Sequence, residues 1–232
     1  LDCEPREFDL QDIRWGNCDR SFLAALNGPA FVASGEGADA DANGTFLDDA
    51  DHVFGFEIAG TAYAVPRWVL FPHELLNAEL DGIPVSLTYC TLCNAPILYD
   101  RRVGDLATGS HSFAGGAGTH TSDAGDSVLT FGNTGMLLSG NKVMYDEETE
   151  TLWDQHAGTP IGGPYQESDP DLFLDQFPVT QTKWGQWRSE YPDTLLLDVD
   201  TGYGYDYSHY DGNIGFFHHY WNSEDVVQPG VE

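Results

Sequence analysis

Two cysteines, Cys90 and Cys93, carry the densest chemistry in the sequence, within the segment Thr88-Tyr-Cys-Thr-Leu-Cys-Asn94. Two sulfurs at this spacing lie close enough to bind one soft metal ion or to close a small disulfide. Covalent haem attachment is excluded, because Asn94 stands where that motif requires a histidine. Three interpretations stay open: a metal site, a redox-active dithiol, and a structural disulfide or pair of buried thiols. The pair follows an expected strand, whereas a thioredoxin-like pair opens a helix.

A second chemical pattern is an acidic loop that resembles the opening of a calcium-binding loop. Oxygen ligands fall at its positions 1, 3 and 5, a glycine at 6 allows the sharp turn, and position 7 offers a carbonyl. Position 12 is Ala50 instead of glutamate, so a neighbouring aspartate has to close the shell. The candidate calcium ligands are Asp39, Asp41, Asn43, Thr45 and Asp49. The alternative is a solvated acidic loop without a bound ion.

Asn43-Gly-Thr45 is also a glycosylation sequon, which fits an exported protein. Asn43 does not readily serve both as a calcium ligand and as a glycan anchor, so the two predictions compete. Cys3 and Cys18 flank a short polar stretch and have no metal-ligand neighbours at a suitable spacing. We expect them to form a structural disulfide, worth about 3 kcal/mol for a loop of this size. Such a bond indicates an oxidising, extracytoplasmic setting.

The charge balance of the 232-residue chain is extreme, with 38 acidic against 9 basic residues and a net charge of -29. In molar salt the Debye length falls to roughly 3 Å, which screens the self-repulsion of such a surface. The acids are spread over the whole chain, which favours a halophilic protein; the alternative is an acidic protein of ordinary habitat. No basic stripe exists to neutralise phosphates, so nucleic acid and anionic membranes are excluded as partners, and metal cations are favoured. No apolar run approaches the length of a membrane span, and no signal peptide starts at Leu1, so we expect a mature or trimmed form.

Short alternating apolar segments separated by turn residues predict an α+β, β-dominated fold: a single domain of short antiparallel strands with a few short helices. Ala59-Gly60 and Asp81-Gly82 are expected turns between strands or elements. Expected strands cover 53–58, 61–65, 84–89, 95–100, 127–131, 136–139, 142–145 and 194–199. Expected helices cover 21–26, 67–80 and 182–191, the last with Trp184 and Trp187 on one face.

The segment around Cys90 and Cys93 resembles the domain-of-unknown-function family 3179, whose members carry a Thr-Tyr-Cys-Pro-Leu-Cys segment. Further matching segments lie in the same order along the chain, among them Val53-Phe-Gly-Phe-Glu57, His73-Glu-Leu-Leu-Asn77, Phe131-Gly-Asn-Thr-Gly135 and Leu152-Trp-Asp-Gln155. Thr91 stands where the family usually has proline. The resemblance implies a shared fold and site but no activity. It divides the chain into an N-terminal arm, short helix and acidic loop (1–50), a family-like core (51–200), and a Tyr/Gly/His-rich C-terminal segment packing on the core (201–232).

Matching segments also supply the residues that could complete a metal site. His73, Met144 and His156 lie in them, which is why we prefer these three to the histidines near the C-terminus. Thiolate, imidazole and thioether ligands select copper or zinc, and the methionine favours copper. The candidate soft-metal ligands are therefore Cys90, Cys93, His73, Met144 and His156.

These patterns favour an extracytoplasmic metal-binding protein, with copper the first choice, or a redox protein centred on Cys90 and Cys93. The alternative is a secreted or cell-surface structural module, assembling with its own copies as an oligomer or filament, in which the cysteines only brace the fold. A third hypothesis is a metal-assisted enzyme. Glu74, beside His73, is a candidate general base if a metal activates water nearby, and the equal alternative is a charge on a helix surface. We expect the protein outside the cell or on the cell surface of a halophile.

Overall fold

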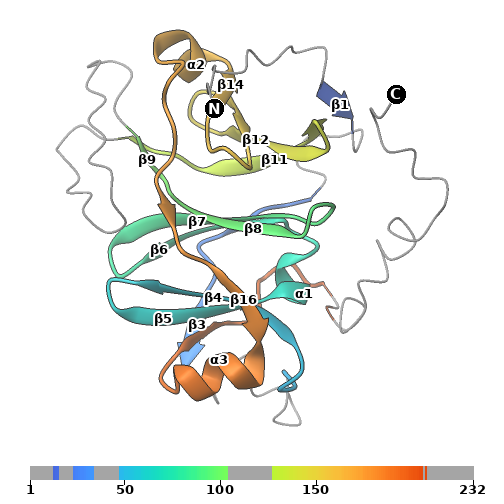
Figure 1. Ribbon diagram of the computed structural model, residues 1–232, viewed down its shortest axis with the longest axis vertical. Helices are drawn as coiled ribbons and strands as arrows, with labels where there is room; N and C mark the ends of the chain where they lie inside the picture. Colours follow the sequence, from blue (N-terminus) through green and yellow to red (C-terminus); the bar gives the residue numbers. More distant parts are fainter. Residues whose placement is uncertain (1–12, 16–22, 34–46, 104–126, 206, 208–232) are drawn as a thin grey trace, which may run out of the picture.

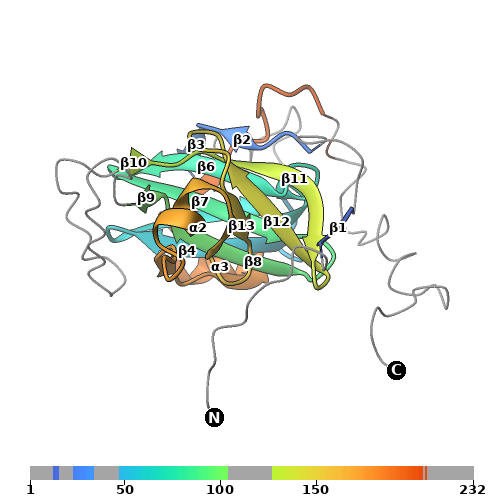
Figure 2. The same ribbon diagram turned by 90° about the horizontal axis from the view of Figure 1, so that it is seen from above.

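A computed structural model describes residues 13–15, 23–33, 47–103, 127–205 and 207. Strands dominate this part of the chain, and the three helices within it have four to seven residues each. The expectation of a β-dominated α+β fold with a few short helices is therefore confirmed. Three five-stranded sheets lie one above another, as Figure 1 shows from the side and Figure 2 from above. We call them the upper, middle and lower sheets, following the orientation of Figure 1.

The middle sheet positions the cysteine pair. Its hydrogen-bonded order is β15 (Gln176–Phe177), β8 (Ala95–Asp100), β7 (Ile83–Cys90), β6 (Leu75–Leu80) and β2 (Leu26–Asn27). Strands β6, β7 and β8 are consecutive antiparallel neighbours, whereas β2 runs parallel to β6. The predicted turn at Asp81-Gly82 is confirmed, and it joins β6 to β7.

The upper sheet covers one face of the middle sheet. Its order is β1 (Ile13–Trp15), β11 (Phe131–Leu138), β12 (Asn141–Asp146), β13 (Leu152–Asp154) and β14 (Pro160–Gly162), all antiparallel. The register between β11 and β12 shifts between Asn133 and Leu137, which marks a β-bulge or similar irregularity. Bulges are frequent next to functional sites, where they redirect side chains. A separate small sheet pairs β9 (Arg102–Val103) with β10 (Ser127–Val128), and helix α2 (Pro164–Ser168) follows β14.

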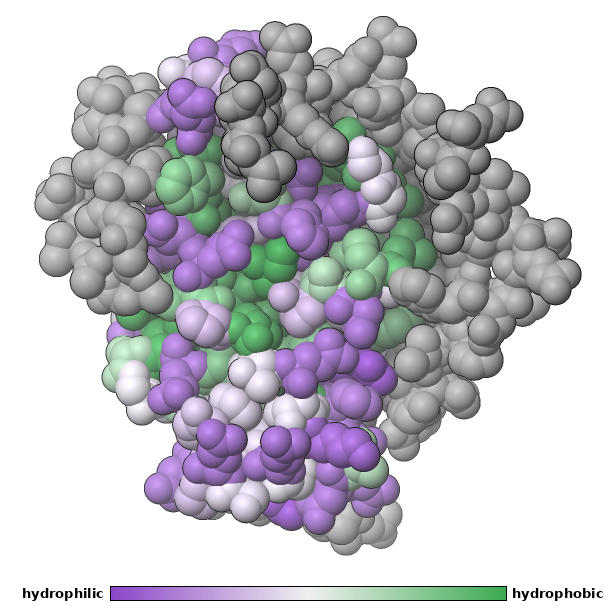
Figure 3. Space-filling view, in the orientation of Figure 1, coloured by the Kyte–Doolittle hydropathy of each residue, from purple (hydrophilic) through white to green (hydrophobic). Residues whose placement is uncertain are grey.

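The lower sheet covers the opposite face. Its order is β16 (Thr180–Lys183), β4 (His52–Ile58), β5 (Thr61–Pro66), β17 (Leu195–Leu197) and β3 (Phe31–Ala33). The predicted hairpin across Ala59-Gly60 is confirmed. Helix α3 (Trp184–Glu190) packs beneath this sheet, with Trp184 and Trp187 buried. Its outer residues are exposed, and the surface in this part of Figure 3 is mostly hydrophilic.

Because both faces of the middle sheet are covered, its central strands β6 and β7 are buried almost throughout. Side chains alternate between faces along a strand. In β7, Leu87 and Tyr89 therefore join the lower apolar core, whereas Thr88 and Cys90 point toward the upper sheet. The lower core is a large apolar cluster, and a second cluster around Phe131 lies between the middle and upper sheets.

Two expected helices are wrong. The segment 67–80 is helical only at α1 (Arg67–Leu70), and Leu75–Leu80 forms the strand β6. The chain reverses at Glu74, whose φ of 55° lies in the left-handed region, and then pairs with β7 along its whole length. Tertiary pairing thus overrides the helix propensity of its Leu, Ala and Glu residues. For the same reason the end of 21–26 belongs to β2, which pairs with β6.

Within the described residues, no helix combines the length and apolar character that crossing a membrane requires.

Candidate functional site

Cys90 and Cys93 form a disulfide across the turn that connects β7 to β8, with their Cα atoms 5.4 Å apart. The strand pairing ends at Cys90 and Ala95, so the pair sits on a tight hairpin connection. The two residues differ in access to solvent: Cys90 is 2% exposed, whereas Cys93 belongs to the exposed class. The two sulfurs are therefore close enough to form one disulfide, and Cys93 is the more accessible of the two cysteines.

The turn between β11 and β12 lies against the exposed sulfur. Cys93 Sγ is 3.5 Å from Asn141 Oδ1 and 3.8 Å from the carbonyl oxygen of Gly140. Asn141 is held in turn, because its Nδ2 donates to Asp154 Oδ1 at 3.0 Å. These neighbours carry no charge at the contact itself, so the upper sheet places fixed, uncharged polar groups beside Cys93.

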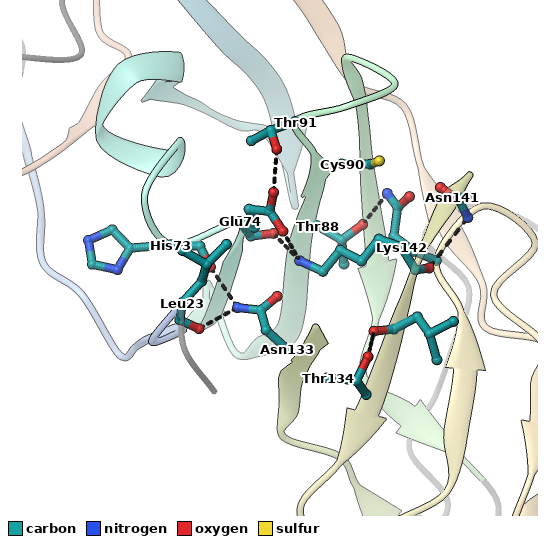
Figure 4. A network of polar contacts seen from close by, with 12 residues as sticks. Leu23, His73, Glu74, Thr88, Cys90, Thr91, Asn133, Thr134, Asn141 and Lys142 are labelled. Atoms are coloured by element: carbon teal, nitrogen blue, oxygen red, sulfur yellow. Dashed lines mark hydrogen bonds and ion pairs between the residues drawn. The ribbon is translucent and has the colours of Figure 1, made fainter. Parts of the chain in front are cut away.

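A buried ion pair lies on the other side of the cysteine loop. Lys142, from β12, donates from Nζ to the backbone carbonyl of Glu74 at 2.9 Å, and its Nζ lies 3.4 Å from Glu74 Oε2. The second carboxylate oxygen of Glu74 accepts a short hydrogen bond from the hydroxyl of Thr91, which lies between the two cysteines in the sequence. Figure 4 shows this chain of contacts running from the upper sheet to the cysteine loop. One carboxylate therefore joins the lysine to the loop.

Burial changes the chemistry of this lysine. Loss of solvation lowers the pKa of Lys142 to about 8, although the nearby Glu74 carboxylate opposes the shift. Lys142 is one of two lysines in the chain, and its side chain is 6% exposed. A buried lysine with a lowered pKa is a recurrent feature of functional sites, although structural ion pairs produce the same shift.

Buried polar side chains extend from this ion pair through the contact between the upper and middle sheets. Gln155 Nε2 donates to Thr88 Oγ1 at 2.9 Å, and Asn133 Nδ2 donates to the carbonyl of His73 at 2.8 Å. We call Glu74, Thr88, Asn133, Lys142 and Gln155 the polar cluster. Asn133 Oδ1 and Gln155 Oε1 are buried and have no hydrogen-bond partner among the described residues. A buried polar atom without a protein partner costs free energy unless water satisfies it, so this cluster differs in its energetics from the apolar packing around it.

The predicted soft-metal ligand His73 is buried and fully hydrogen-bonded. Its Nδ1 lies 2.7 Å from the carbonyl oxygen of Ala24, which can only accept, so Nδ1 carries the proton. The Nε2 atom then accepts a hydrogen bond from the hydroxyl of Tyr207 at 2.7 Å. Burial lowers the pKa of His73, which keeps the ring neutral. The imidazole in Figure 4 points away from Cys90, and the rings of Tyr203, Tyr205 and Tyr207 lie around it.

Met144 and His156 lie in different surroundings. Met144 is fully buried in the apolar cluster that contains Phe131 and Trp153, whereas His156 is exposed just after β13. Across the described residues, no three or more His, Cys, Asp and Glu side chains come close enough together to hold a metal ion. The described structure therefore brings Cys90 and Cys93 together but places neither His73 nor His156 beside them as a metal ligand.

Most of the other predicted sites lie outside the described residues. This holds for Cys3 and Cys18, and for the calcium candidates Asp39, Asp41, Asn43 and Thr45, with Asn43 also the predicted glycan anchor. Asp49 is described. Its carboxylate accepts a hydrogen bond from Arg188 Nη2 of α3 at 2.8 Å, an ion pair exposed to solvent. Calcium binding and glycosylation in this loop stay predictions.

Sequence reasoning found the cysteines but missed the role of Lys142 and Thr91. It considered Glu74 as a base beside a metal or as a charge on a helix surface. One signal was available: a lysine in a strongly acidic chain, placed at the start of an otherwise apolar strand, is unusual enough to suggest a buried charge. Its partner was not visible, because Glu74 lies 68 positions earlier and reaches Lys142 through the stacking of two sheets.

Comparison with known proteins adds a family and no activity. Neither the curated proteins nor the solved structures contain a match to this chain. A family model described as "Protein of unknown function (DUF3179)" matches residues 24–227, which includes the cysteine pair, Glu74 and Lys142. The expected family is confirmed: the chain belongs to the DUF3179 family of proteins of unknown function.

Proposed function

We propose that this protein is an extracytoplasmic thiol–disulfide redox protein whose working group is the Cys90–Cys93 pair. The observation that carries the proposal is the unequal access to the two sulfurs: a disulfide with Cys93 exposed at a hairpin turn and Cys90 buried behind it. An exchange reaction needs one sulfur that a partner can attack and a second that leaves and later returns.

The arrangement supports a definite sequence of steps. A thiolate of a partner dithiol attacks Cys93 Sγ, the bond to Cys90 breaks, and Cys90 leaves as a thiolate that takes a proton from water. The partner's second thiolate then attacks its own sulfur in the mixed disulfide, which releases the Cys93 thiolate, and this thiolate also takes a proton from water. The partner loses two electrons and becomes a disulfide, and Cys90 and Cys93 gain them as two thiols. The reverse sequence reduces a partner disulfide.

Two features affect which partner associates fastest: the uncharged polar groups beside Cys93 and the negative charge of the whole chain. Gly140 and Asn141 place no charge at the exposed sulfur, so a partner meets hydrogen-bonding groups there. The surface as a whole carries a large negative charge. Association with a basic partner is therefore faster than with an acidic one, and the advantage disappears in concentrated salt. An oxidising compartment outside the cytoplasm is where such a disulfide persists.

The test measures reduction of the native protein. The folded chain is treated with dithiothreitol, and the modified cysteines are identified by alkylation and peptide mass mapping, which separates this pair from Cys3 and Cys18. We expect reduction of Cys90–Cys93 to proceed faster than global unfolding. Reduction that occurs only at the rate of unfolding would favour the structural alternative and refute the proposal.

A matched pair of variants assigns the attacked sulfur. Cys90→Ser leaves the exposed thiol of Cys93, which should form a mixed disulfide rapidly with 5,5′-dithiobis(2-nitrobenzoic acid). Cys93→Ser leaves the buried thiol of Cys90, which should react at least tenfold more slowly. Equal rates would contradict the assignment.

Metal analysis of the same samples checks the copper hypothesis. The reduced pair offers two soft donors, so copper or zinc binding by the dithiol form stays a prediction. One metal ion bound per reduced chain, with charge-transfer absorbance that disappears in Cys90→Ser, would favour metal binding over exchange.

A further inference from the structure

The turn that carries the two cysteines is short and is held at both ends. Cys90 ends β7 and Ala95 begins β8, and the two are paired. Residues 91–94 are therefore the part of the loop that can move when the disulfide opens. Asn94, the last of these residues, takes a φ of 51°, and its Oδ1 accepts a hydrogen bond from the hydroxyl of Tyr89 at 2.8 Å.

Thr91 connects this turn to the rest of the molecule. It is 5% exposed, and its hydroxyl donates to Glu74 Oε1. The acceptor is a carboxylate, and hydrogen bonds to charged acceptors are about twice as strong as those between neutral groups. This contact is therefore a strong tie on the mobile part of the loop.

Glu74 is itself held by contacts on its backbone and its side chain. Its N–H donates to Leu70 at 2.7 Å, and its carbonyl accepts from the N–H of Tyr89 at 2.8 Å and from Lys142 Nζ at 2.9 Å. Oε2, the carboxylate oxygen of Glu74 that does not bond Thr91, lies 3.4 Å from Lys142 Nζ. The ion pair thus fixes the carboxylate to the middle sheet next to β7 and to β12 of the upper sheet. Thr91 is therefore hydrogen-bonded to a carboxylate that contacts outside residues 91–94 hold in place.

We propose that Thr91 is a positioning residue that, through Glu74 and Lys142, holds the two sulfurs at bonding distance and makes the disulfide harder to reduce. The inference rests on the redox function proposed above. Two thiols kept close have a high effective concentration toward each other, which favours the closed form. Releasing Thr91 lets residues 91–94 spread after reduction, which lowers that concentration and shifts the equilibrium toward the dithiol.

The experiment measures the equilibrium constant between disulfide and dithiol in dithiothreitol or glutathione redox buffers, with peptide mapping of the Cys90–Cys93 segment. Thr91→Val removes the hydroxyl and keeps the shape, and we expect a shift of about tenfold toward the dithiol. Thr91→Ser keeps the hydroxyl and should stay within twofold of the unmodified protein.

Thr134→Val is the matched control. Thr134 is 4% exposed and lies in the same layer, and its hydroxyl donates to the carbonyl of Val143 at 2.6 Å, without contact to the loop. It should leave the constant unchanged. Should Thr91→Val not fold, Glu74→Gln provides a second route, with a weaker acceptor of equal size and an expected shift of a few fold in the same direction.

Constants within twofold for both Thr91→Val and Glu74→Gln would overturn the inference. A shift for Thr134→Val as large as that for Thr91→Val would also overturn it, because general loosening would then explain both. The proposed function fails on a different readout, the rate of native-state reduction. An inert native disulfide would refute that function while the equilibrium constants stay measurable, so the two ideas fail separately.

Discussion

The two contacts that the middle sheet makes differ in chemistry. Its lower face packs an apolar layer in which Phe54, Val65, Leu76 and Leu87 are fully buried. Its upper face is apolar around Phe131 but carries the polar cluster near the cysteine loop. The lower contact gains stability from every group that it buries. The polar cluster instead includes a buried charge and amide oxygens without partners, each costing free energy. The lower contact should therefore contribute most of the stability, whereas the polar cluster is connected to the cysteine loop by the hydrogen bond from Thr91 to Glu74.

The largest expected effect comes from weakening the lower contact. Phe54→Ala removes a fully buried aromatic ring from the lower apolar core, and it should reduce the free energy of unfolding by about 3–5 kcal/mol. Denaturant unfolding followed by tryptophan fluorescence measures this loss. Phe54 packs against Tyr89, whose hydroxyl donates to Asn94 of the cysteine turn, so the disulfide equilibrium constant of the folded variant should shift, but by less than in Thr91→Val. A large change in that constant would show that the two contacts are coupled.

Breaking the ion pair at the upper contact should have a smaller effect. Glu74→Ala leaves Lys142 buried without its carboxylate, at an expected cost of about 2 kcal/mol, below the usual range for a buried pair because Glu74 is partly exposed and Lys142 can lose its proton. The double variant Lys142→Met with Glu74→Gln should recover most of that stability, since it removes the buried charge. A double variant less stable than Glu74→Ala would show that the ion pair is itself stabilising.

The pH dependence of stability tests the same lysine without the loss of its partner. An unfolded lysine keeps its proton to about pH 10.5, whereas folded Lys142 releases it near pH 8. Between these values the unfolded state binds more protons, so stability should rise with pH. Above about pH 10 it should fall again, because burial raises the pKa of Tyr89 to about 12 and the unfolded tyrosine ionises first. Unfolding measured from pH 7 to 10 should show the rise, and Lys142→Met should abolish it.

Salt should affect the two contacts equally, because both are buried and the acidic charge lies on the surface. We expect the melting temperature to rise by several degrees between dilute buffer and molar potassium chloride, as screening reduces self-repulsion. Phe54→Ala and Glu74→Ala should show the same increase as the unmodified chain. A melting temperature that is flat or falls with salt would contradict the halophilic interpretation.

Local patterns predicted the hairpins well. The pairs at Ala59-Gly60 and Asp81-Gly82 combine turn residues with flanking apolar strands, so the signal needs no distant contact. The strand 75–80 was mistaken for a helix because the middle sheet is buried on both faces, which removes the alternation of polar and apolar residues that identifies a strand. Single-sequence patterns do not reveal which sheets stack.

The site shows the same division. The spacing of Cys90 and Cys93 was enough to predict their chemistry, because both cysteines lie on one short segment. Glu74 precedes β6 of the middle sheet and Lys142 lies in β12 of the upper sheet, so their contact depends on how the two sheets stack. His73 was taken as a free ligand, although its ring is used in hydrogen bonds to Ala24 and Tyr207. Such contacts follow from tertiary structure and leave little trace in local sequence.

The outermost strands of the three large sheets have a consequence for how copies of the protein could meet. In the described residues these strands are β1, β14, β15, β2, β16 and β3, and each has two to four residues. Strand-to-strand addition between molecules needs a long row of unpaired backbone groups. Each of these short strands offers few such groups, so two copies that met along them would be held together mainly by side-chain contacts, and their association would depend on ionic strength.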